Sequence, residues 1–122
     1  MTKEERQLLL KDLCARLPYG VICRLSTADV SATEELDLGG LEHFIFGNVD
    51  VKPYLRPMSS MTEEEELDFI LKCDSVLRMT EKNHTCILSI NEIDWLLSHH
   101  FDYRGLIEKG LALESPEDMY NI

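Results

Sequence analysis

Three capping boxes constrain this fold more than any other feature, because they mark where helices begin. In each box a Ser or Thr is followed three residues later by Glu: Thr2 with Glu5, Thr62 with Glu65, and Ser89 with Glu92. The hydroxyl and the carboxylate satisfy N–H groups that the first helical turn leaves without partners. The sequence therefore predicts three main helices, over residues 2–16, 62–77 and 89–100.

Two alternating segments after the first helix predict strands. Residues 21–27 place apolar side chains on one face and polar ones on the other, which is typical of a half-buried strand. A polar turn over residues 28–33 is expected to lead into a second strand over residues 35–38. These segments predict a sheet with one buried face.

Glycine and proline set the rest of the predicted sheet. The Gly-Gly pair at 39–40 predicts a hairpin turn, and residues 41–46 then alternate as a third strand. Because proline has no N–H to give to a ladder, Pro53 and Pro57 exclude residues 52–58 from a central strand. We expect that segment to be an edge strand or an extended wrap.

The chain is predicted to be a single α+β domain spanning residues 1–122. Its sheet should be small and mostly antiparallel, with about three to four strands including a short one over residues 85–90. It should pack with the three main helices and a short C-terminal helix. The charged start lacks the apolar region of a signal peptide, and no apolar run approaches the ~18 residues of a membrane span. We therefore expect a cytoplasmic protein without membrane contact.

Acidic side chains dominate the composition. Asp and Glu number 23 against 12 Lys and Arg, which gives a net charge of −11. Direct binding to a nucleic-acid backbone is not expected, because phosphate contacts need clustered basic residues. Such acidity usually keeps a small protein soluble, and a rarer use is imitation of nucleic acid.

The four cysteines form no metal-binding or redox motif. They are Cys14, Cys23, Cys73 and Cys86, and no two fall in a C-x-x-C pair. We expect each to be a small buried hydrophobe with a free thiol. His84 and Cys86 would share a face of a strand, so a Cys–His dyad is conceivable. A loop histidine beside a buried cysteine is the favoured interpretation, because nothing nearby would lower the thiol pKa.

Residues 89–114 hold the only Trp and an Asp-Tyr-Arg-Gly cluster. Asp102 is predicted to cap a second short helix, and Gly110 to end it. Arg104 and Glu108 are four residues apart and are expected to pair on its surface. An alternative is that Arg104, with its neighbour Tyr103, binds an anion at the start of that helix.

The adjacent histidines in this stretch are weak candidates for a metal site. His99 and His100 would lie about 100° apart on a helix, so one metal ion could not easily reach both from one face. Adding Asp102 gives His-His-x-Asp, which matches no zinc spacing. We therefore predict no metal and no cofactor, with core or capping roles for the histidines. A small hydrolase or metalloenzyme that uses these three residues remains an alternative.

Three blocks of sequence resemble a known group of proteins. They are LPYG at 17–20, KPYLRPMSSMTEEE at 52–65, and DWL at 94–96 followed by HHFDYRGLI at 99–107 and GLA at 110–112. In this order they are similar to a family of short proteins from gut anaerobes, their phages and prophages. That family has no assigned activity and no established catalytic residues. The resemblance implies a phage or mobile-element context and no mechanism.

A non-enzymatic interaction protein is the function that these observations favour. Aromatic and Arg side chains are the usual anchors of interfaces. The candidate binding residues are Tyr54, Arg56, Trp95, His100, Phe101, Tyr103 and Arg104. The alternative for this set is that the aromatics fill a small core. A second functional hypothesis is an acidic decoy that occupies a nucleic-acid site on a host defence protein. The sequence identifies neither the protein partner nor the oligomeric state.

Overall fold

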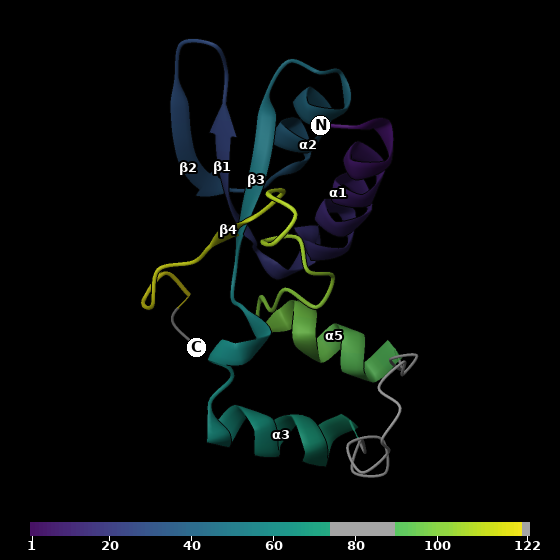
Figure 1. Ribbon diagram of the computed structural model, residues 1–122, viewed down its shortest axis with the longest axis vertical. Helices are drawn as coiled ribbons and strands as arrows, with labels where there is room; N and C mark the ends of the chain where they lie inside the picture. Colours follow the sequence, from purple (N-terminus) through teal and green to yellow (C-terminus); the bar gives the residue numbers. More distant parts are fainter. Residues whose placement is uncertain (74–89, 121–122) are drawn as a thin grey trace.

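The computed structural model describes residues 1–73 and 90–120, and within them the chain is a mixed α+β fold (Figure 1). The helices are α1 (Lys3–Arg16), α2 (Leu38–Ile45), α3 (Glu63–Cys73) and α5 (Ile90–Ser98). The strands are β1 (Ile22–Ser26), β2 (Ser31–Glu35), β3 (Asp50–Leu55) and β4 (Leu113–Glu114), in the spatial order β2-β1-β3-β4. The predicted fold class is confirmed. None of the helices described is long and apolar enough to cross a membrane.

The helix starts follow the capping boxes. Thr2 Oγ accepts from the Glu5 N–H at 3.1 Å and Glu5 Oε1 accepts from the Thr2 N–H at 2.8 Å, which opens α1. The box of Thr62 and Glu65 opens α3 in the same way. α5 confirms the third helix, although Ser89 and the predicted strand over residues 85–90 lie outside the described residues, apart from Ile90 itself.

The β1–β2 hairpin is tighter than the sequence suggested. The Thr27 N–H donates to the Val30 carbonyl at 2.8 Å, so the turn closes within four residues. The predicted positions of the polar turn, residues 28–33, and of the second strand, residues 35–38, are therefore wrong. β2 starts at Ser31 and pairs antiparallel with β1.

Residues 41–46 were predicted as a strand, but residues 41–45 belong to α2 and Phe46 is its C-cap. Asp37 Oδ1 accepts from the Gly40 N–H at 2.8 Å and caps the helix. Leu41 and Phe44 are buried three residues apart, whereas Phe46 is 75% exposed. A strand would have placed Phe44 and Phe46 on the same face, so the helical period decides this segment.

The segment expected to be an edge, β3, lies between two neighbours. It pairs antiparallel with β1 over Asp50–Pro53 and parallel with β4 over Tyr54 and Leu55. Pro53 is the last residue paired with β1, and pairing with β4 starts one residue later. The N–H that proline lacks therefore falls where one ladder gives way to the other, which is how an inner strand tolerates it.

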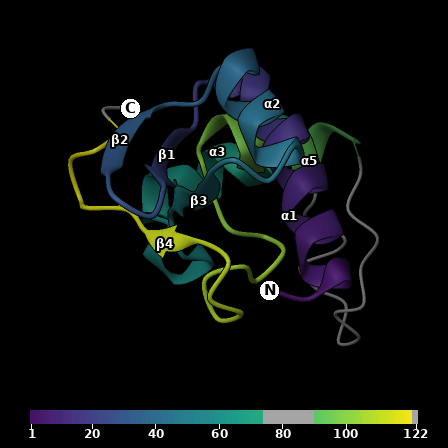
Figure 2. The same ribbon diagram turned by 90° about the horizontal axis from the view of Figure 1, so that it is seen from above.

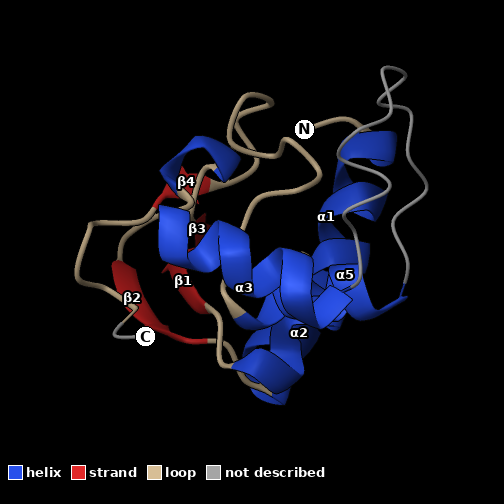
Figure 3. Ribbon diagram, turned by 90° about the horizontal axis from the view of Figure 1, so that it is seen from below, coloured by secondary structure: helices blue, strands red, loops and turns tan. Residues whose placement is uncertain are grey.

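Apolar side chains form two clusters. The larger one lies among α1, α2, the sheet and residues 106–112, and its fully buried members are Leu9, Leu13, Val21, Cys23, Val51, Leu55 and Leu106. Seen along the long axis, α1, α2 and α5 gather to one side of the strands (Figures 2 and 3). The smaller cluster joins α3 to α5 through Phe69 and Trp95, with ring centroids 5.1 Å apart.

The cysteines meet the expectation of burial only in part. Cys23 is buried in β1, but Cys14 is exposed. On α1, Cys14 lies about 140° around the helix from the buried Leu9, so it falls on the outer face. The side chain of Cys73 is not described, and His84 and Cys86, the residues of the conceivable dyad, lie outside the described residues.

Candidate binding groove

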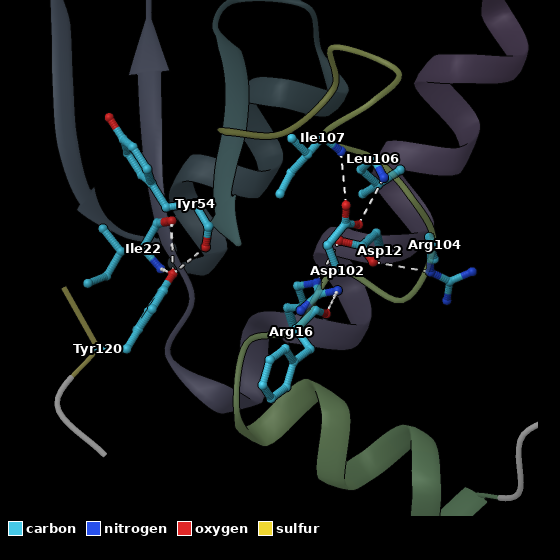
Figure 4. Close-up of polar contacts among 10 residues, drawn as sticks. Asp12, Arg16, Ile22, Tyr54, Asp102, Arg104, Leu106, Ile107 and Tyr120 are labelled. Atoms are coloured by element: carbon cyan, nitrogen blue, oxygen red, sulfur yellow. Dashed lines mark hydrogen bonds and ion pairs between the residues drawn. The ribbon is translucent and has the colours of Figure 1, made fainter. Parts of the chain in front are cut away.

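The Asp102–Gly105 cluster stabilises the backbone turns that follow it. The predicted short helix after Asp102 is instead a series of turns. The Asp102 carboxylate accepts from the Leu106 N–H at 2.8 Å and the Ile107 N–H at 3.0 Å, so it does cap backbone donors as expected (Figure 4). Gly110 ends these turns with a φ of 75°, a left-handed conformation that favours glycine.

Arg104 pairs with α1 and not with Glu108. Its Nε donates to Asp12 Oδ1 at 3.1 Å, while Arg16 Nε donates to Asp12 Oδ2 at 2.7 Å (Figure 4). Arg16 also donates to the Phe101 carbonyl at 2.7 Å, and the side chains of Asp12 and Arg16 are fully buried. One carboxylate thus holds residues 101–104 against α1. The sequence reasoning missed Asp12 and Arg16.

The Tyr103 ring lies close to both guanidinium groups of this network. Its ring centroid is 5.0 Å from Arg104 Cζ and 5.6 Å from Arg16 Cζ, within the range of cation–π contacts. Tyr103 is half-buried, so little of its ring is left for an external anion or partner. The arrangement favours the structural interpretation of this tyrosine and arginine.

Three of the predicted binding residues are buried at the end of α5. Trp95 and His100 are 7% exposed and Phe101 is fully buried. The rings of Trp95 and Phe101 are stacked with centroids 5.8 Å apart. Their burial supports the alternative that these aromatics fill a core, and it argues against their serving as surface anchors. Burial, and then the positive charge of Arg16, lowers the pKa of His100 to about 4, so its ring is neutral near neutral pH.

Tyr54, another predicted binding residue, contributes its backbone. Its carbonyl accepts from the Tyr120 hydroxyl at 2.7 Å, and the same hydroxyl accepts from the Ile22 N–H at 2.9 Å (Figure 4). Ile22 and Tyr54 stand one step beyond the last β1–β3 pair, so the phenol bridges the separating strands. The Tyr120 ring stacks on His100 with centroids 3.7 Å apart. The sequence reasoning missed Tyr120.

Arg56 is the predicted binding residue that lines a groove. Its two terminal nitrogens donate to the two carboxylate oxygens of Glu65, each at 2.7 Å, and its Cζ lies 4.3 Å from the centre of the Phe101 ring. The bonds from Arg56 hold the pKa of Glu65 at about 2, so this pair stays ionised. It fixes the start of α3 against the end of β3.

Residues at the start of α3 and in the C-terminal segment 114–120 line a groove, which we name the acidic groove. Its volume is about 850 Å³. The ionisable groups on its walls are Glu64, Glu65, Asp68, Glu114, Glu117, Arg56, His99 and Tyr120. Five carboxylates against one guanidinium leave a net charge of −4 when His99 and Tyr120 are neutral. Glu64, Glu114 and Glu117 have no ion-pair partner among the described residues.

The predicted metal or hydrolase residues face separate partners. His99 stacks on Trp95 with centroids 4.0 Å apart, His100 stacks on Tyr120, and Asp102 caps the turn after it. In the part of the chain that the structure describes, no three His, Cys, Asp or Glu side chains are placed to hold a metal ion. Burial raises the pKa of the Cys23 thiol to about 12, so that group stays protonated.

Carboxylates are not confined to one face of the molecule. Exposed acidic residues occur on α1, β2, α2 and α3, which lie on different sides of the fold (Figure 1). A nucleic-acid decoy would gather them along one surface at phosphate-like spacing. The distribution over the described residues therefore does not favour that hypothesis.

The chain matches no protein-family model, no curated protein and no solved structure. Its function has to be inferred from its own residues.

Proposed function

We propose that the protein is a non-enzymatic interaction module that binds a positively charged segment of a protein partner in the acidic groove. One observation carries this proposal: a groove of about 850 Å³ in which five carboxylates face one guanidinium. Carboxylates gathered in a concave site repel one another, and a cationic partner relieves that repulsion. Complementary charge of this kind gives specificity and speeds association.

Two hydroxyl groups that line the groove have roles in local structure. Ser60 Oγ donates to the Pro57 carbonyl at 2.7 Å, and Thr62 Oγ accepts from the Glu65 N–H at 3.2 Å. Both hydroxyls are thereby engaged in local structure, whereas a nucleophile needs a base beside it. The resemblance to proteins of phages and prophages supports an accessory role in the cytoplasm of a bacterial host.

Trp95 offers a direct test, since it is the only tryptophan and touches two groove residues. Its Nε1 donates to Asp68 Oδ2 at 2.9 Å and its ring stacks on His99. Titration with a hexa-arginine peptide should change its fluorescence in a saturable way that weakens as salt is added. Hexaglutamate should cause no change.

Two charge-matched variants decide where such a peptide binds. The double variant Glu114→Gln, Glu117→Gln removes two carboxylates from the groove, and Glu42→Gln, Glu108→Gln removes two exposed carboxylates outside it. We expect the groove variant to bind at least about fivefold more weakly and the control to bind as the unchanged protein does. Equal loss in both variants would mean that the peptide responds only to overall charge, and the proposal would fail.

A further inference from the structure

β2 is an edge strand that presents an unpaired side. Among the described residues it pairs only with β1, and all five of its residues are exposed. No hydrogen bond from another described segment reaches its outer side. It contains no proline, one of the common ways of protecting such an edge, although it carries two charged side chains, Glu34 and Glu35. β2 is therefore a five-residue strand held by one ladder alone.

The hydrogen bonds that flank the hairpin fix which backbone groups point outward. Thr27 donates to the Val30 carbonyl at 2.8 Å, and Leu36 donates to the Val21 carbonyl at 2.9 Å. In an antiparallel ladder, bonded and non-bonded pairs alternate. Because the bonding pattern repeats every two residues between these two bonded pairs, the second and fourth residues of β2 are the ones that bond to β1.

Ser31, Thr33 and Glu35 therefore direct their N–H and C=O groups away from β1. This gives the outer side of β2 three donors and three acceptors, which is enough to pair with a short extended peptide. Ala32 and Glu34 bond inward. The same alternation aims the Ile22 N–H of β1 toward β3, where it meets the Tyr120 hydroxyl, so the pattern agrees with an independent contact.

A hollow beside β2 supplies a second, independent observation. Its volume is about 560 Å³, and Glu34, Asp37, Leu25 and His43 are among the residues that line it. Glu34 stands opposite Cys23, a buried residue, so it lies on the face of the sheet that looks toward the core. Glu34 has no ion-pair or hydrogen-bond partner among the described residues. One side chain that lines the hollow, Glu34, therefore comes from the edge strand itself.

We infer that the outer side of β2 binds an extended, lysine- or arginine-rich segment of a protein partner as an added strand. Strand addition uses main-chain hydrogen bonds for affinity and pockets beside the strand for specificity. Here the pocket side carries Glu34 and Asp37, and the opposite face of the strand carries Glu35, so basic side chains complement both faces. A second copy of this chain fits less well, because both partners would carry a net charge of −11.

The test starts from a displayed library of random short peptides selected on the whole chain and needs no known partner. Thr33→Pro removes the middle outward N–H but leaves the β1 ladder, because that N–H points away from β1. Selected peptides should be rich in Lys and Arg and should bind Thr33→Pro about tenfold more weakly. They should bind Glu34→Gln about fivefold more weakly. Circular dichroism checks that both variants fold.

A second measurement does not depend on the variants. Methylating alternate backbone nitrogens of a selected peptide removes the donors that pair with β2, so binding should be lost. The proposal is overturned if no peptide is selected, if Thr33→Pro and the methylated peptide both bind normally, or if a dimer that Thr33→Pro disrupts occupies the edge. It is also overturned if Glu114→Gln, Glu117→Gln abolishes peptide binding, because the peptides then occupy the acidic groove and only the groove proposal stands.

Discussion

Asp12 should be the ionisable residue whose loss destabilises this fold most among those described. Among the described contacts, the Asp12 carboxylate is the only one that pairs with Arg16. The side chains of Asp12 and Arg16 are both fully buried. After Asp12→Ala, Arg16 keeps its bond to the Phe101 carbonyl, but its Nη1 already lacks a partner among the described residues. Leaving one member of a buried pair without its partner costs about 3–5 kcal/mol. We expect a loss in the free energy of unfolding within that range.

Arg104 provides the internal comparison, because it bonds to the same carboxylate but is 21% exposed. Water can replace its contact with Asp12, so Arg104→Ala should cost at most about 1 kcal/mol. Urea denaturation followed by circular dichroism measures both changes. Equal losses for Asp12→Ala and Arg104→Ala, or a loss below about 1 kcal/mol for Asp12→Ala, would refute this reasoning.

A paired replacement tests the same reasoning from the other side. Asp12→Leu with Arg16→Met removes both buried charges and keeps apolar volume in the site. Because no unpaired buried charge remains, the double variant should be clearly more stable than Asp12→Leu alone. A double variant no more stable than Asp12→Leu alone would contradict this reasoning.

Three further outcomes follow from the contacts around the groove and the strand ends. The pKa of His100 is lowered from 6.5 to about 4 in the folded chain. As the pH is lowered, the imidazole therefore binds a proton in the unfolded chain before it does so in the folded one, and the free energy of unfolding should fall from pH 6.5 to about pH 4. Replacing His100 by Phe should make the free energy of unfolding depend less on pH over this range. An unchanged pH dependence would contradict the assignment of this effect to His100. Arg56→Ala should raise the pKa of Glu65 from about 2 toward its ordinary 4.5, as measured by NMR titration, and a Glu65 that still titrates near 2 would exclude Arg56 as the cause. Tyr120→Phe should cost about 1–2 kcal/mol and speed hydrogen exchange of the Ile22 N–H, and unchanged exchange would show that the hydroxyl does not hold that donor.

Local patterns predicted the elements whose causes are local. The capping boxes at Thr2 and Thr62 located two helix starts, and an alternation broken only at Ile22 located β1. α2 was missed because the Gly-Gly pair was interpreted as a hairpin turn, although Asp37 two residues earlier is a helix-capping residue. The place of β3 depends on β4, a partner almost 60 residues away, so no local pattern could have supplied it.

The candidate site shows the same division. The sequence identified Asp102 as a cap, and the structure places its carboxylate on two N–H groups. The partner of Arg104 was wrong because Asp12 is 92 residues earlier in the chain. A signal for Asp12 was present, since Asp12 and Arg16 share the face of α1 that carries Leu9, and charged residues four apart on an apolar face predict a buried pair. Tyr120 gave no such signal.

β3 changes its neighbouring strand at Pro53, and this determines how the fold would respond to proteolysis near the C-terminus. Only its second half depends on the last stretch of chain, through the pairing with β4 and the bond from the Ser115 N–H to the Leu55 carbonyl. Proteolytic removal of the residues after 112 would remove one wall of the acidic groove, but the four residue pairs between β1 and β3 would remain. The clipped molecule would keep the outer side of β2 and lose the groove, so this cleavage would remove one surface and leave the other.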